Sequence, residues 1–145
     1  MPAPTRFVLL PNSEMPKALQ LAELIGRRLA DAGAAVSTFI PTQSLSAPLP
    51  DLANADLAVV LGGDGTLLRA AHLCAPLGIP LLGVQAGKLG FLSELTENSW
   101  ETLLPRLLGG DYRVEKRMML LAQHIRDERV CSEWDVVNEL VVSRG

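Results

Sequence analysis

Apolar runs and amphipathic stretches alternate along the first two thirds of the chain, which is typical of a parallel sheet layered with helices. Continuous apolar runs predict buried strands at residues 7–10 and 57–61, and two further strands are expected at 36–40 and 79–84. Over residues 16–32 apolar side chains recur every three or four positions, which predicts an amphipathic helix with Ser13 as its cap and Gly33 as its C-terminal stop. The fold class is therefore expected to be α/β, a largely parallel sheet with flanking helices.

Two further helices are expected, one from the glycine loop at 62–66 to about residue 75 and one ending at residues 109–110. Asn98 and Glu101 have the spacing of a capping box and predict where the second of these helices begins. The Ser- and Pro-rich stretch 42–50 is expected to be a loop.

After residue 111 the pattern changes. Two β-prone runs, at 113–125 and 134–143, flank a charged turn at 126–129 with no helical stretch between them. These runs predict the first strands of an all-β domain, with Met118 and Met119 in its core. The expected domains are therefore 1–111 and 112–145. Because an unpaired apolar edge is an unusual end for a sheet, the sequence also predicts a truncated chain.

Composition and net charge exclude some classes of function. A net charge of −3 at pH 7 argues against a nucleic-acid or membrane surface, because both require clustered Lys and Arg, and neither partner is expected. Cys74 and Cys131 follow no metal-ligand spacing and are expected to be reduced thiols, so we predict a cytoplasmic protein and assign no residue as a metal ligand. The first apolar run is too short for a signal peptide or a membrane span.

The sequence Gly-Gly-Asp-Gly-Thr at 62–66 joins an apolar strand to a helix, at the end of a strand where α/β sheets bind their ligands. Glycine N–H groups beside a helix N-terminus favour phosphate. A carboxylate at this position would repel phosphate unless it has another task, and Asp64 could accept a proton from an attacking hydroxyl or hold Mg²⁺. The alternative is a plain turn, in which Asp64 or Thr66 only caps the helix. Arg69 and Lys88 are candidate phosphate ligands, with surface charge as the alternative.

Three segments together resemble a known family. The sequence GGDGT resembles the signature shared by NAD kinases, diacylglycerol and sphingoid lipid kinases and, with Ser for Thr, 6-phosphofructokinases. Residues 87–92, GKLGFL, resemble the GxLGFL segment of NAD kinases. Asn138-Glu139, followed by Arg144-Gly145, resembles the NE…RG element of the same family. The three segments occur in the family's order, so the chain resembles the N-terminal portion of an NAD kinase.

The resemblance implies an activity and a set of roles. Asp64 would activate the adenosine 2′-hydroxyl of NAD, which then attacks the terminal phosphoryl of ATP, with Mg²⁺ or another divalent cation present. The phosphate region would be lined by Gly62, Gly63, Gly65 and Thr66, and NAD would be bound by Phe91, Asn138 and Glu139. The family also implies a homo-oligomer. Gln85 departs from the family, which usually has Asn at the end of this strand.

Alternatives to these roles remain at the level of sequence. Phe91 by itself is typical of ordinary core, and a β-bulge would account for Asn138 and Glu139 without any function. A lipid kinase sharing the GGDGT loop would have a hydrophobic acceptor site, which residues 85–95 do not favour. A non-catalytic nucleotide-binding fragment is the third possibility, because a half-built site would exclude water poorly.

Overall fold

The computed structural model describes residues 2–40, 50–87, 90, 92–137 and 140–141, and its first five strands form one parallel sheet. The strand order is β2-β1-β3-β4-β5. In chain order the strands are β1 (Arg6–Pro11), β2 (Ala35–Thr38), β3 (Leu57–Gly62), β4 (Leu81–Gln85) and β5 (Leu95–Thr96). The predicted α/β fold with a parallel sheet is confirmed.

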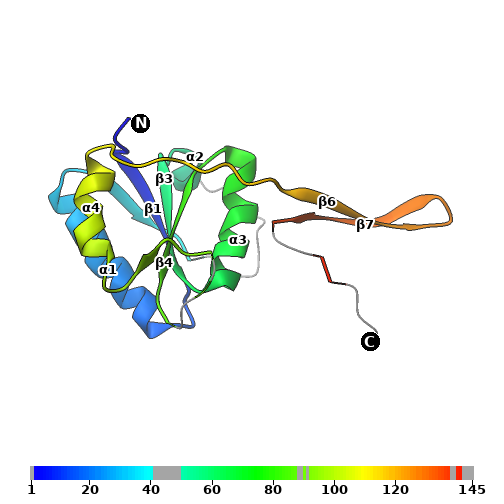
Figure 1. Ribbon diagram of the computed structural model, residues 1–145, viewed down its shortest axis with the longest axis horizontal. Coiled ribbons are helices and arrows are strands. Elements are labelled where there is room, and N and C mark those ends of the chain that lie inside the picture. The colour runs from blue at the N-terminus through cyan, green and yellow to red at the C-terminus, as the bar shows by residue number, and fades with distance from the viewer. Residues whose placement is uncertain (1, 41–49, 88–89, 91, 138–139, 142–145) are drawn as a thin grey trace. The chain divides into compact units, whose positions relative to one another are not determined.

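Helices cover both faces of this sheet (Figure 1). They are α1 (Pro16–Asp31), α2 (Pro50–Ala53), α3 (Asp64–Cys74), the short 3₁₀ helix η1 (Ala75–Leu77) and α4 (Trp100–Leu108). Helices α1 and α4 pack on one face, and α2 and α3 pack on the other. Among the helices that the structure describes, none is long and apolar enough to cross a membrane.

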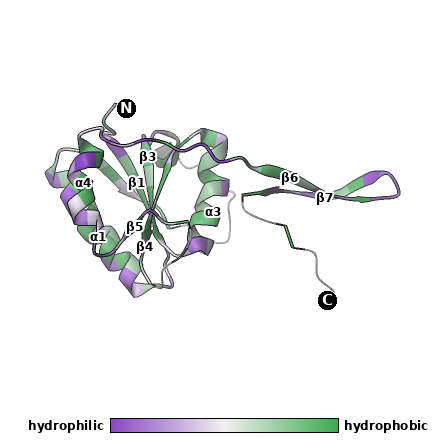
Figure 2. Ribbon diagram, in the orientation of Figure 1, coloured by the Kyte–Doolittle hydropathy of each residue, from purple (hydrophilic) through white to green (hydrophobic). Residues whose placement is uncertain are grey.

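The two covered faces explain why the central strands β1 and β3 are apolar at nearly every position. On β1, Phe7 and Leu9 face the cluster that contains α1 and α4. Their neighbours Val8 and Leu10 face the cluster that contains α2 and α3. Successive side chains of a strand point to opposite faces, so a strand covered on both sides needs no polar position. Figure 2 shows the central strands β1, β3 and β4 as mostly apolar, whereas α1 and α4 carry many polar residues.

The ends of α1 differ in part from the prediction. Its N-cap is Met15, which makes no side-chain capping hydrogen bond to the residues described, so the predicted cap at Ser13 is wrong. Pro16 opens the helix instead, at a position where the missing N–H costs no hydrogen bond. Gly33 has φ +85°, as a C-terminal stop requires, and that prediction is confirmed.

The capping box predicted for α4 is also wrong. The N-cap is Ser99, not Asn98, and no side-chain capping bond is present among the described residues. The Ser99 hydroxyl bonds instead to a residue that precedes the helix: it accepts a hydrogen bond from the Thr96 backbone N–H at 2.9 Å. The strand predicted from residue 79 begins at Leu81, because η1 and Gly78, with φ +67°, occupy the preceding residues. The two-residue β5 was not predicted.

Residues Val114–Gly145 form a second compact unit, separate from Met1–Arg113. Its strands β6 (Leu120–Arg126) and β7 (Arg129–Val136) pair antiparallel around a turn at Asp127 and Glu128, which have φ 50° and 61°. β7 begins directly after this two-residue turn, at residue 129 and not at 134, and β6 begins at 120 and not at 113. The register shifts by one residue between His124 and Ile125. Met118 is 78% exposed, so the prediction that it lies in a core is wrong for the described residues.

Candidate active site at the carboxyl edge of the sheet

Three adjacent strands end at the same edge of the sheet and bring their following residues together. Asn12 follows β1, and its backbone N–H bonds to the Leu61 carbonyl of β3 at 2.8 Å. Gly62 ends β3, and its carbonyl accepts the Ala86 N–H, which follows β4, at 3.2 Å. The carboxyl edge of a parallel sheet is where α/β proteins bind ligands, so these loops define the candidate site.

The first glycine loop leads directly into α3. Gly63 is the N-cap in an extended conformation, and Asp64 is the first residue of the helix. The Gly63 carbonyl accepts hydrogen bonds from the N–H groups of Thr66 and Leu67, at 3.0 and 3.2 Å. The N-terminus of an α-helix carries a partial positive charge and favours anions, which suits both the Asp64 carboxylate and a phosphate.

Gly62 is required by close packing and not by backbone conformation. A Cβ at this position would lie 2.5 Å from Thr66 Oγ1 and 2.9 Å from Thr66 Cβ. Thr66 is itself buried, and its Oγ1 accepts a hydrogen bond from Asn12 Nδ2 at 3.2 Å. The Thr66 hydroxyl therefore ties α3 to the end of β1, and a contact with phosphate, as the sequence predicts, stays a prediction.

The Asp64 carboxylate lies against the second glycine-bearing segment. Its Oδ1 accepts a hydrogen bond from the Leu92 backbone N–H at 3.2 Å. A Cβ on Gly90 would collide with Oδ1 and would lie 2.7 Å from the carboxyl carbon and 2.9 Å from Oδ2. Two segments that are 28 residues apart along the chain thus meet at this one carboxylate.

The remaining predicted site residues divide into two groups. Gly65 and Arg69 are on α3, and both are exposed. Four predicted residues lie outside the described part of the chain: Lys88, Phe91, Asn138 and Glu139. The structure therefore brings together the GGDGT residues, and the roles given to the others stay predictions.

Sequence reasoning missed Asn12 and Gly90 as parts of this site. Asn12 received no role from the sequence, although the residue after a strand that neighbours β3 belongs to the same edge of the sheet. Gly90 was noted only as one residue of the GKLGFL segment. A glycine in a loop facing an aspartate could have indicated a close approach, but its partner is not visible from the sequence.

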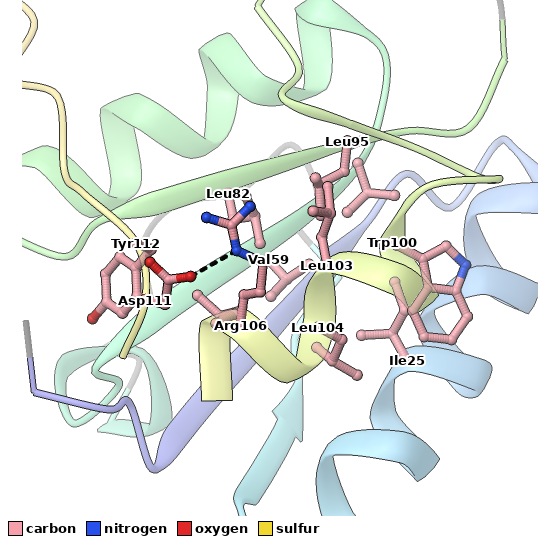
Figure 3. A pocket seen from close by; sticks show the side chains of 12 residues that line it. Ile25, Val59, Leu82, Leu95, Trp100, Leu103, Leu104, Arg106, Asp111 and Tyr112 are labelled. Carbon is pink, nitrogen blue, oxygen red and sulfur yellow. Dashed lines mark hydrogen bonds and ion pairs between the residues drawn. The ribbon is translucent and has the colours of Figure 1, made fainter. Parts of the chain in front are cut away.

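A separate apolar pocket of about 200 Å³ lies between the sheet and α4 (Figure 3). Its lining comes mainly from β3, β4, β5, α1 and α4 and contains no residue of the GGDGT loop. At one side Arg106 Nε donates to Asp111 Oδ2 at 2.7 Å, and this hydrogen bond lowers the pKa of the Asp111 carboxyl. The pocket is thus a gap in the packing layer, away from the polar groups of the candidate site.

Comparison with known proteins identifies the chain's relatives. The profile of the ATP-NAD kinase N-terminal domain matches residues 49–112. The NAD kinase of Heliobacterium modesticaldum is 43% identical over 152 aligned residues, which cover 98% of this chain and 52% of that enzyme. The NAD kinase of Symbiobacterium thermophilum is 38% identical over 148 residues, with 97% and 52% covered. The chain spans about half the length of the curated relatives it matches.

A solved structure supports the fold. The crystal structure of yeast NADH kinase complexed with NADH superposes with a TM-score of 0.66 over 93% of this chain and 44% of that chain. At 19% sequence identity this likeness carries the fold alone. The fold, the GGDGT loop at the carboxyl edge and the sequence relatives agree, and the chain belongs to the NAD kinase family, matching its N-terminal domain.

Proposed function

We propose that this chain supplies the catalytic carboxylate and the phosphate-binding loop for the phosphorylation of NAD by ATP, which yields NADP and ADP. One observation carries the proposal: Asp64 is the first residue of α3, at the carboxyl edge of the sheet, within a glycine loop. A carboxylate in a phosphate-binding loop is suited to activating a hydroxyl nucleophile. The relatives named NAD kinase favour NAD as the acceptor.

In the proposed step Asp64 accepts the proton of the adenosine ribose 2′-hydroxyl. The hydroxyl oxygen forms a bond to the terminal phosphorus of ATP as the bond from that phosphorus to the bridging oxygen breaks, and ADP leaves with the electron pair. The glycine loop at 62–65 and the N-terminus of α3 stabilise the phosphate charge. Positioning and electrostatics account for most catalysis in phosphoryl transfer, so a loop fixed by packing is well suited to the reaction.

The residues present are compatible with Mg²⁺. Among the described residues no group of three or more His, Cys, Asp and Glu could hold a metal ion. Mg²⁺ usually takes only one or two carboxylates together with substrate phosphates and water, so a dedicated cluster is not needed. Because Asp64 acts as the base in the proposed step, such an ion would be held by the phosphates of ATP and by water. When bound, the ion would neutralise phosphate charge.

The roles of the remaining predicted residues are part of the same proposal. Phe91 would pack beside the adenine, and Asn138 and Glu139 would hydrogen-bond NAD. Arg69 and Lys88 would approach the phosphates. The complete enzyme would be a cytoplasmic homo-oligomer, as the family resemblance implies.

An assay for NADP formation from NAD, ATP and Mg²⁺ tests the proposal. We would run it on this chain alone and on a chimera in which the chain replaces the matching part of the Heliobacterium modesticaldum enzyme. Asp64→Asn is the matched control, since it keeps the shape of the side chain and removes its basicity. NADP formation that depends on Asp64 supports the proposal. A chimera that folds and binds NAD but makes no NADP contradicts it, and phosphorylation of diacylglycerol in its place would show a lipid kinase.

A further inference from the structure

The segment between β4 and β5 is fixed at both of its ends. At its start the Ala86 N–H bonds to the Gly62 carbonyl at 3.2 Å, which joins it to the first glycine loop. At its end Glu94 Oε2 accepts the Gly83 N–H of β4 at 3.0 Å. A Cβ on Gly83 would lie 3.0 Å from the Ser93 Cα, so the two backbones pack closely there. Leu92 therefore lies next to a stretch of backbone that is held against the sheet.

The Asp64 carboxylate meets this held segment at two points. The Leu92 N–H donates to Oδ1 at 3.2 Å, which restricts rotation of the carboxylate. Gly90 leaves the space that the carboxylate occupies, because a Cβ there would lie 2.7 Å from the carboxyl carbon. An added methyl group would therefore displace the carboxylate, which is the end of a side chain.

We propose that Gly90 and the Leu92 N–H are positioning groups for the Asp64 carboxylate in the phosphoryl transfer. The inference rests on the proposed function and deepens it, because it gives the second glycine segment a task toward the base itself. Oδ1 is held by the N–H, and the carboxylate is oriented before substrate binds. Orienting a base in advance avoids reorganisation during the reaction, and a displacement of about 1 Å can cost about 10²-fold in rate.

A spectroscopic measurement on this chain tests the contact without reference to activity. The amide hydrogen of Leu92 should exchange slowly with solvent because it is bonded to Asp64 Oδ1, and this response, slow exchange, should vanish in Asp64→Ala. In Gly90→Ala the response should also vanish, because the carboxylate is displaced. In Gly87→Ala it should persist, because among the described residues a Cβ at Gly87 meets the flexible end of Met15, at 3.3 Å. A Gly90→Ala chain that keeps the response would overturn the proposal.

Kinetics separate positioning from binding. In the form of the protein that makes NADP, Gly90→Ala should lower kcat by about 10²-fold and leave KM for NAD unchanged, while Gly87→Ala retains kcat. An unchanged kcat in Gly90→Ala, or a loss confined to KM, would contradict the inference. If the wild type makes no NADP, the proposed function fails, and the Leu92 response still decides the contact.

A further variant covers the case in which Gly90→Ala does not fold. Asp64→Ala removes the carboxyl group with which the new methyl collides. The double variant Asp64→Ala with Gly90→Ala should then fold and match Asp64→Ala in urea stability. If the double variant is as unstable in urea as Gly90→Ala, the methyl group collides elsewhere and the positioning contact is refuted.

Discussion

Replacing Gly62 by alanine should destabilise the first unit by a predictable amount. The new Cβ would lie 2.5 Å from Thr66 Oγ1, 2.9 Å from Cβ and 3.1 Å from Cγ2. Thr66 is β-branched, 6% exposed and on a helix, so it has little freedom to move away. Overpacking of this kind costs about 1–3 kcal/mol. Displacing Thr66 also breaks its hydrogen bond to Asn12, which is worth about 0.5–1.5 kcal/mol, so the two contributions together give an expected loss of about 1.5–4.5 kcal/mol.

Gly65→Ala is the matched control, since no described atom lies within 4 Å of a Cβ there. Gly65 is in α3, where alanine is favoured by up to about 1 kcal/mol, so this variant should be at least as stable as the wild type. Combining Gly62→Ala with Thr66→Ala removes Oγ1 and Cγ2 but leaves the Cβ contact. The cost of Gly62→Ala should then fall by about half.

Urea denaturation followed by Trp100 fluorescence measures these differences. Trp100 is 4% exposed and reports on the first unit, whereas Trp134 of the hairpin is 52% exposed and would be replaced by Phe in every variant. The midpoint should shift without a change in the slope of the free energy with urea. Equal stability of Gly62→Ala and Gly65→Ala would refute the close approach of β3 to α3.

Two further predictions concern titratable groups away from the site. Hydrogen bonds from Arg6 and Thr5 hold the pKa of the Asp56 carboxyl well below its usual range, so its contribution to stability is fully present above about pH 4 and is lost as the pH falls. Asp56→Asn should thus lower the free energy of unfolding by on the order of 1–2 kcal/mol at pH 7. Between about pH 5 and 2 the variant should lose less stability than the wild type, and parallel pH profiles of the two proteins would contradict this. Burial raises the pKa of the Cys74 thiol to about 12, whereas Cys131 is exposed. A thiol reagent should therefore label only Cys131 in the native chain and both cysteines in urea, and rapid native labelling of Cys74 would count against its burial.

The central strands were predictable because they are buried on both faces. Residues 57–61 are apolar without a break, and all of β3 is buried between two helical layers. Their parallel arrangement followed from the helical stretches that separate them. The element ends were less predictable, because they depend on local hydrogen bonds. The Ser99 hydroxyl, for example, bonds to Thr96, and the sequence offers Asn98 as an equally good cap.

The hairpin shows what the sequence leaves open in the second unit. The charged turn was placed correctly, but both strands were misplaced around it. The run 113–119 is β-prone and yet lies outside any strand, and β7 begins directly after the turn at Asp127 and Glu128. The turn sets the pairing next to it and the register shift between His124 and Ile125 sets the pairing beyond, so propensity along one run does not give the strand ends.

Only the GGDGT motif of the candidate site could be predicted from the sequence. Asp64 stands out because a carboxylate is unexpected among glycines that suit phosphate. Its contacts with Gly90 and Leu92 come from a loop that follows the next strand, and they depend on the parallel pairing of β3 with β4. A pairing between segments far apart in the chain is a property of the fold, so no local pattern could have indicated it.

The central claim is that Asp64 is the base in phosphoryl transfer to NAD and not a structural turn residue. The most direct test compares turnover and NAD affinity for the wild type and Asp64→Asn in the form that makes NADP. The account predicts a loss of about 10²–10⁴-fold in kcat with the Kd for NAD essentially unchanged. Turnover that survives the substitution, or a loss of NAD binding as large as the loss of turnover, would contradict it.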